Sequence, residues 1–170
     1  SCGYNNVKLW DLNGKSLLSF QQENIASAVF SPDGSKIIAA SGTGSIDIMD
    51  LPGNTRQQLN LLAENRELLS AALSPDNKGI LTVYSDGLAV LWDMKGISLA
   101  EFQHEGAINT AIFSPDGNYV LTSSLDKKAC LWDLKGNPLA AFDHENAVFS
   151  AVFSPDGKKL VFASNRQPDG

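Results

Sequence analysis

The sequence predicts an all-β fold built from repeated four-stranded antiparallel sheets, and two periodic signals support this prediction. The tripeptide Ser-Pro-Asp recurs in steps of 43, 40 and 40 residues, at Ser31, Ser74, Ser114 and Ser154. A second series, in which Asp closes an apolar strand, has steps of 39, 43 and 40 residues, at Asp11, Asp50, Asp93 and Asp133. A period of about 40 residues that carries Trp-Asp once per unit is typical of the blades of a β-propeller.

Composition limits the partners of the chain. With 170 residues, 43% of them hydrophobic and 19% charged, the chain is long and apolar enough to bury a core. A net charge of -6 disfavours a nucleic-acid or anionic membrane surface, which needs clustered Lys and Arg. The two cysteines, Cys2 and Cys130, lack metal-type spacing and are expected as reduced thiols. We therefore expect no nucleic-acid partner, no membrane partner, no metal and no cofactor.

Strand and turn signals divide the chain into units of one propeller domain, or part of one, over residues 1–170. Apolar stretches of four to six residues alternate with turn pairs such as Asn13-Gly14, Asp86-Gly87 and Lys135-Gly136. The expected units are a half blade at 7–20, whole blades at 25–61, 68–102 and 107–142, and a half blade at 147–163. This amounts to about four blades.

The two half blades are complementary, because the first supplies strands three and four of a unit and the last supplies strands one and two. Three arrangements follow from this: a closed four-blade ring, two chains sharing an eight-blade ring, and a fragment of a longer chain. An open half-ring would leave strand edges exposed, and such edges invite pairing with another chain.

Residues 7–163 resemble WD40 repeats, especially the bacterial type in which Leu-Trp-Asp-Leu-Lys-Gly is combined with Phe-Ser-Pro-Asp-Gly. The best copy is Gln103–Phe142, with these motifs at Leu131–Gly136 and Phe113–Gly117. The last stretch, Phe153–Arg166, also resembles the repeat of TolB-like propellers. The expected location is the cytoplasm, and the periplasm is the alternative that the TolB likeness implies.

The WD40 resemblance implies a buried hydrogen-bonded set in each blade, made of a His, a Ser or Thr, an Asp and a Trp. In the best copy the set is His104, Thr122, Asp126 and Trp132. The unit before it keeps Thr82, Asp86 and Trp92 but has Glu64 in the His position. The unit at 25–61 has Gln21, Ala39, Thr43 and Met49 in these positions, so we expect it to depend on apolar packing. A blade made from both chain ends would join His144, Phe162 and Arg166 to Trp10.

Function is expected in the loops, because propellers bind through loops held by rigid sheets. The resemblance places a candidate binding face at Gln22, Asn24, Asn65, Glu67, Ser85, Glu105, Leu125, Glu145 and Asn165. These residues are polar to acidic, which favours an unidentified protein partner with some basic character. The function expected is a noncatalytic protein-protein interaction scaffold, with no catalytic residues and no enzymatic activity. The alternatives are the sensor part of a larger signalling protein and a TolB-like or enzyme-associated propeller that binds a small ligand in its channel.

Overall fold

The structure is a computed structural model that describes residues 6–51, 53, 55–61 and 66–165. These residues form sixteen strands in five antiparallel sheets, which contain two, four, four, four and two strands along the chain. The predicted all-β fold, with a half blade at each end and three whole blades between, is therefore confirmed. No helix in the described ranges is long and apolar enough to cross a membrane.

Each sheet is a meander of strands that are consecutive in the chain. The first half blade consists of β1 (Asn6–Trp10) and β2 (Ser16–Gln21). The first whole blade contains β3 (Ile25–Phe30), β4 (Lys36–Ser41), β5 (Ser45–Asp50) and β6 (Arg56–Asn60). The second contains β7 (Leu68–Leu73), β8 (Gly79–Tyr84), β9 (Leu88–Asp93) and β10 (Ser98–Gln103). The third contains β11 (Ile108–Phe113), β12 (Tyr119–Ser124), β13 (Lys128–Asp133) and β14 (Pro138–Asp143), and the last half blade consists of β15 (Val148–Phe153) and β16 (Leu160–Ser164).

The repeated Ser-Pro-Asp tripeptide forms the turn between the first two strands of a unit. In the third blade the Ser114 hydroxyl donates to Asp116 Oδ1 at 2.6 Å and accepts from the backbone N–H of Tyr119 at 2.9 Å. Gly117 then closes the turn with a φ of +74°, which a residue with a Cβ rarely adopts. The hydrogen bond from Ser114, followed by those from Asn118, holds the pKa of Asp116 below its usual value. The periodic signal in the sequence thus marks a turn that each copy builds locally.

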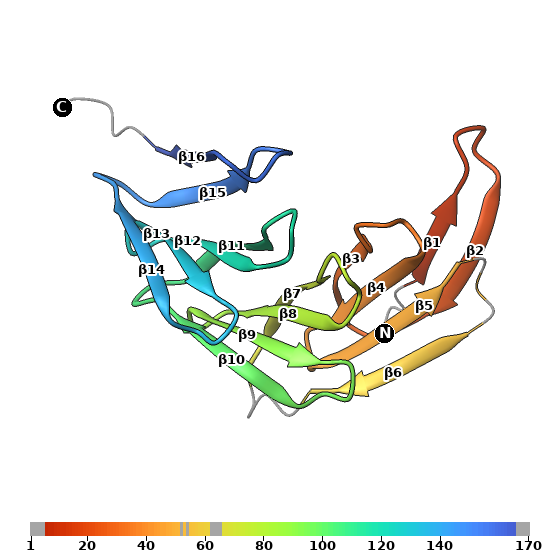
Figure 1. Ribbon diagram of the computed structural model, residues 1–170. Coiled ribbons are helices and arrows are strands. Elements are labelled where there is room, and N and C mark those ends of the chain that lie inside the picture. The colour runs from red at the N-terminus through yellow and green to blue at the C-terminus, as the bar shows by residue number, and fades with distance from the viewer. Residues whose placement is uncertain (1–5, 52, 54, 62–65, 166–170) are drawn as a thin grey trace.

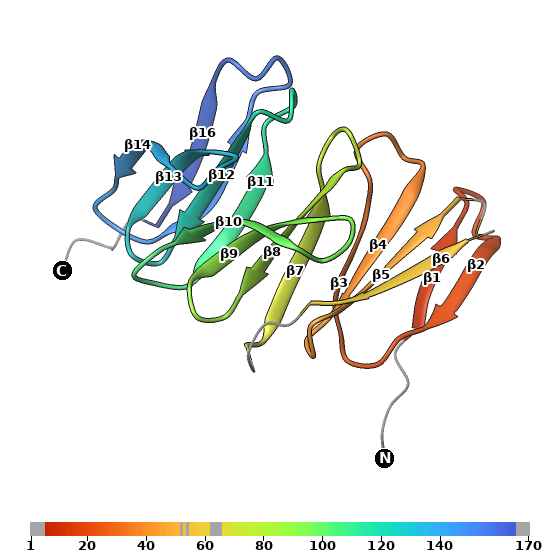
Figure 2. The same cartoon turned by 60° about the horizontal axis from the view of Figure 1, so that its bottom comes forward.

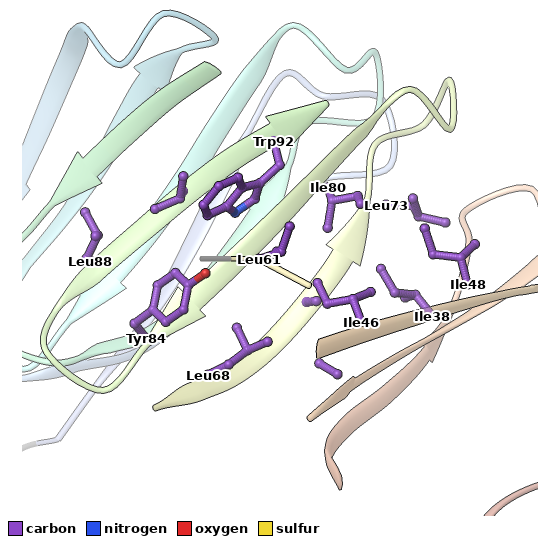
Figure 3. Close-up of a cluster of buried hydrophobic side chains, with 13 residues drawn as sticks. Ile38, Ile46, Ile48, Leu61, Leu68, Leu73, Ile80, Tyr84, Leu88 and Trp92 are labelled. Carbon is purple, nitrogen blue, oxygen red and sulfur yellow. The ribbon is translucent and has the colours of Figure 1, made fainter. Parts of the chain in front are cut away.

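Apolar side chains lie between the sheets, and each cluster is shared by two neighbouring sheets. Successive residues of a strand point to opposite faces, so Ile37 packs toward the first half blade while Ile38 packs toward the second whole blade. Figure 3 shows the latter cluster, in which Ile38, Ile46 and Ile48 of the first whole blade meet side chains of the second. A similar cluster joins the second and third whole blades around Phe102 and Trp132. The sheets are therefore held face to face along the chain.

The five sheets follow one another along an open arc (Figure 1). The half blade of β1 and β2 lies at one end of the arc and that of β15 and β16 lies at the other, as both views show (Figures 1 and 2). Among the described strands, β1 pairs with β2 and β16 pairs with β15, and no ladder joins β1 to β16. The closed four-blade ring, one of the three arrangements expected from the sequence, is therefore not the arrangement found.

Candidate functional site

The third whole blade contains a buried hydrogen-bonded chain of four side chains. His104 Nδ1 lies 2.8 Å from Asp126 Oδ2, and His104 Nε2 lies 2.7 Å from Thr122 Oγ1. Trp132 Nε1 donates to the same Thr122 oxygen at 2.8 Å. Burial raises the pKa of Asp126, but the hydrogen bonds from His104 and from the backbone N–H groups of Lys128 and Glu105 outweigh burial and lower the pKa overall. The set crosses the blade from the loop before β11 to β13, and its groups satisfy one another inside the blade, with the Asp126 side chain, 8% exposed, at the rim.

Thr122→Val removes the central oxygen of this chain while keeping the shape of the side chain. We expect the free energy of unfolding to fall by about 2 to 4 kcal/mol, because His104 Nε2 and Trp132 Nε1 both lose their partner in a buried place. The matched control is Thr82→Val in the second blade, where Trp92 is the one described residue whose side chain donates a hydrogen bond to the hydroxyl, and we expect a loss of about 1 to 2 kcal/mol there. Urea unfolding of the two variants measures the difference, and equal losses would contradict a shared network.

The second blade keeps part of the same arrangement. Trp92 Nε1 donates to Thr82 Oγ1 at 2.8 Å, as its counterpart does in the third blade. The Asp86 carboxylate, however, pairs with the Arg66 guanidinium at 2.6 Å near the surface. The Glu64 position expected to replace the His lies outside the described residues. In this blade Asp86 is therefore held by an ion pair with Arg66, a loop residue two positions after Glu64. The aligned repeats did not indicate this pair.

The first whole blade replaces the network with different polar groups, and two expectations for it are wrong. Gln22, not Gln21, is the residue turned into the blade: its side chain is buried and its Nε2 donates to the Ala39 carbonyl at 3.2 Å. The blade also does not depend on apolar packing alone, since the fully buried Asp47 accepts two hydrogen bonds from Arg56, at 2.9 and 2.7 Å. The hydrogen bonds to Asp47 raise the pKa of Arg56. The sequence signal that points to this pair is a lone Asp in the middle of an apolar strand.

The loops of the candidate binding face lie side by side along one end of the sheets. Each loop between strands two and three is hydrogen-bonded through its backbone to a loop that precedes a strand one: Ser85 N–H donates to the Glu67 carbonyl at 3.0 Å and Leu125 N–H to the Ala107 carbonyl at 2.9 Å. Between blades, His104 N–H donates to the Gly87 carbonyl at 3.0 Å. Gly87 has a φ of +84°, and a Cβ there would lie 2.6 Å from the Gly106 carbonyl oxygen. Close backbone packing thus joins the loops of neighbouring blades into one row.

Most of the residues expected on this face are exposed in the row. The exposed members are Asn24, Glu67, Ser85, Glu105, Leu125, Glu145 and Asn165. Asn65 lies outside the described residues. Gln22 is the exception, because it is buried within the first whole blade and its side chain is not available to a partner. We call the exposed set, without Gln22 and Asn65, the loop row.

A hollow lies along the first strands of the blades. It has a volume of about 450 Å³ and is lined mainly by apolar side chains and prolines: Pro32, Ala72, Leu73, Pro75, Ile112, Phe113, Ser114, Pro115, Val152 and Phe153. The one hydroxyl in this lining, Ser114, already donates to Asp116 within its turn. Small-molecule sites combine apolar walls with a few convergent polar groups. The side chains of this lining offer no hydroxyl that is free to bind a ligand. No cluster of metal-ligating side chains occurs among the residues that the structure describes.

Four-stranded antiparallel sheets that follow an arc and pack face to face define the blades of a β-propeller. The family model of the WD40 repeat (WD domain, G-beta repeat) matches residues 96–133 and 136–167, which run from just before β10 to just beyond β16. Two segments in the second half of the chain therefore match the WD40 repeat.

A curated protein similar to this chain is the Protein LST8 homolog of Drosophila pseudoobscura pseudoobscura. It is 30% identical over 103 residues, which cover 55% of this chain and 33% of the relative. The chain thus spans about one third of the length of this relative.

Proposed function

We propose that the chain is a noncatalytic scaffold for protein-protein interaction and that it binds its partner through the loop row. WD40 repeats and the likeness to an LST8 homolog support a scaffold in general terms. The observation that supports this particular surface is the set of exposed loop residues fixed at one end of rigid sheets by backbone hydrogen bonds. Loops held in this way can present side chains to a partner with little cost of ordering.

Charge indicates the chemistry of the partner. Glu67, Glu105 and Glu145 are exposed and recur once per unit along the row. None of the described ion pairs involves these three carboxylates. A row of acidic groups favours a segment rich in Lys or Arg, because complementary charge speeds encounter and selects among partners.

His104 is poorly suited to catalysis in this arrangement. Both ring nitrogens of His104 are engaged with Asp126 and Thr122 inside the blade. A general base must reach a substrate proton, and a side chain committed in this way does not. This engagement supports a scaffold over an enzyme.

Exchanging three glutamates tests the loop row as a binding surface. Against a panel of synthetic peptides that range from acidic to basic, we expect the parent chain to bind basic peptides. The triple variant Glu67→Gln, Glu105→Gln, Glu145→Gln should bind them roughly tenfold more weakly, since each exposed pair contributes about 0.2 to 1 kcal/mol. Fluorescence anisotropy at low salt is the measurement.

The control for net charge removes three exposed lysines from turns at the opposite end of the sheets, with Lys95→Gln, Lys135→Gln and Lys158→Gln. This variant becomes more acidic overall, so it should retain or strengthen binding of basic peptides. Unchanged binding by the glutamate variant would show that the loop row is not the binding surface.

A further inference from the structure

We propose that two copies of this chain complete each other's half blades and form an eight-blade ring in solution. The observation behind this is that β16 and β1 each end a sheet and pair with no further strand among the described residues, at opposite ends of the arc (Figure 1). In a whole blade, the counterparts of these two strands are neighbours: β12 pairs with β13. A second copy, related to the first by a half-turn about the axis of the ring, would place its β16 beside β1 of the first copy and its β1 beside β16.

The strand pairings of the whole blade fix the register of this contact. Phe153 pairs with Leu160 as Phe113 pairs with Val120, so Leu160 corresponds to Val120. Leu9 pairs with Leu18 as Leu131 pairs with Ala140, so Leu9 corresponds to Leu131. Because Leu121 pairs with Leu131 in the whole blade, Val161 of one copy should face Leu9 of the other.

A hollow beside β1 has the lining that the partner strand needs. It has a volume of about 100 Å³ and is lined by Val7, Lys8, Leu9, Ala28, Val29, Phe30 and Ile37. In the second whole blade the corresponding space is filled by Leu81 and Val83 of β8, which pack against Ala111 and Phe113 of the next blade. Val161 corresponds to Leu81 by its strand pairing, and it is 63% exposed in the single chain. The second copy's Val161 is thus the side chain that fits the hollow.

Trp10 at one end of the arc and His144 at the other also support a contact between two copies. Trp10 is 53% exposed, whereas Trp132, its counterpart in the whole blade, is 8% exposed. His144 Nε2 is buried at the other end without a hydrogen-bond partner among the described residues, and its ring packs edge-on against Phe162 at 5.3 Å. Phe162 occupies the position that Thr122 has in the third whole blade. The shared blade is therefore closed by apolar and aromatic contacts, and Trp10 of the second copy supplies the last aromatic ring. Open edges with exposed apolar side chains pair readily with a matching strand.

The mass in solution tests the proposal. The chain has a mass of 18.2 kDa, and we expect light scattering after size-exclusion chromatography to give twice this mass. Val161→Lys should return the protein to the mass of one chain, because a charged side chain on an edge strand opposes pairing. Ile97→Lys is the matched control, since Ile97 is 59% exposed in the turn before β10, away from both open edges, and this variant should keep the doubled mass. A parent chain of single mass, or a Val161→Lys protein that stays double, overturns the proposal.

Cysteines placed at the facing pair test the register and the closure. In a Cys2→Ser background, the double variant Leu9→Cys, Val161→Cys should oxidise to a covalent pair of chains and stop there, because both contacts of a closed ring are then used. Non-reducing electrophoresis and mass spectrometry read the product. A ladder of longer products would show open-ended assembly, a disulfide within one chain would show a self-closed ring, and an absence of cross-links would show a different contact, and each of these results overturns the proposal.

Discussion

Replacing Trp132 with Ala is expected to lower the free energy of unfolding by about 3 to 5 kcal/mol, the range found when a large buried aromatic side chain is removed. The indole is 8% exposed and lies in the cluster between the second and third whole blades, with its ring 5.8 Å from that of Phe102 in an edge-to-face arrangement. Truncation leaves a cavity at this junction and also removes the hydrogen bond to Thr122. Urea unfolding followed by circular dichroism measures the loss.

Trp132→Phe separates packing from hydrogen bonding at the same position. The smaller ring retains much of the apolar contact but has no N–H, so we expect a loss of about 1 to 2 kcal/mol. Leu125→Ala in the exposed loop row should change stability by less than about 0.5 kcal/mol. If Trp132→Ala unfolded at the same urea concentration as the parent, the junction between these blades would not be limiting for stability.

Replacing Arg56 with Met should destabilise the first whole blade by about 2 to 3 kcal/mol, because it leaves the carboxylate of Asp47 buried without its ion-pair partner. Asp47 is fully buried, and the Arg56 guanidinium holds it with two hydrogen bonds. The side chain of Arg56 is 40% exposed, so water lessens the loss and the value lies below that of a fully buried pair. Thermal or urea unfolding gives the change.

The double variant Asp47→Leu, Arg56→Met removes the charge together with its partner. Since apolar residues of similar volume often replace a buried ion pair without loss, we expect this variant to lie within about 1 kcal/mol of the parent. A double variant as unstable as Arg56→Met alone would show that the loss comes from the packing of the Arg side chain and not from an unpaired charge.

The fold was predictable because its signals are local and repeated. Each Ser-Pro-Asp turn is built from hydrogen bonds within six residues, as between Ser114 and Tyr119, so every copy can be recognised by itself. The apolar strands follow from the same logic, since alternate residues such as Ile37 and Ile38 belong to different clusters, and the strand is buried on both faces.

The polar interior of the blades was predictable in one copy and not in the others. His104, Thr122 and Trp132 follow the repeat pattern and meet as the resemblance implies. Gln22 takes the position that His104 has in the third blade, one residue from the position expected, and the pair of Asp47 and Arg56 has no counterpart in the pattern, because a blade that lacks the His and Trp can satisfy its buried groups in several ways. Which way is chosen depends on side-chain reach across strands, and that is set by the tertiary structure.

The open arc was also not predictable from the sequence. Half blades at the two termini are compatible with closure and with an open arc, and strand patterns alone do not fix the angle between one sheet and the next. The structure places the described parts of β1 and β16 at opposite ends of the arc.

The apolar clusters have a consequence for the modularity of the molecule. Each cluster belongs to two sheets at once, as Figure 3 shows for the first and second whole blades. The cooperative unit is therefore the seam between neighbours, and an excised single blade would turn both of its apolar faces to water. In such a linear array, stability is the sum of weak units and strong nearest-neighbour couplings. A destabilising substitution in one blade should therefore lower the stability of the two flanking blades most.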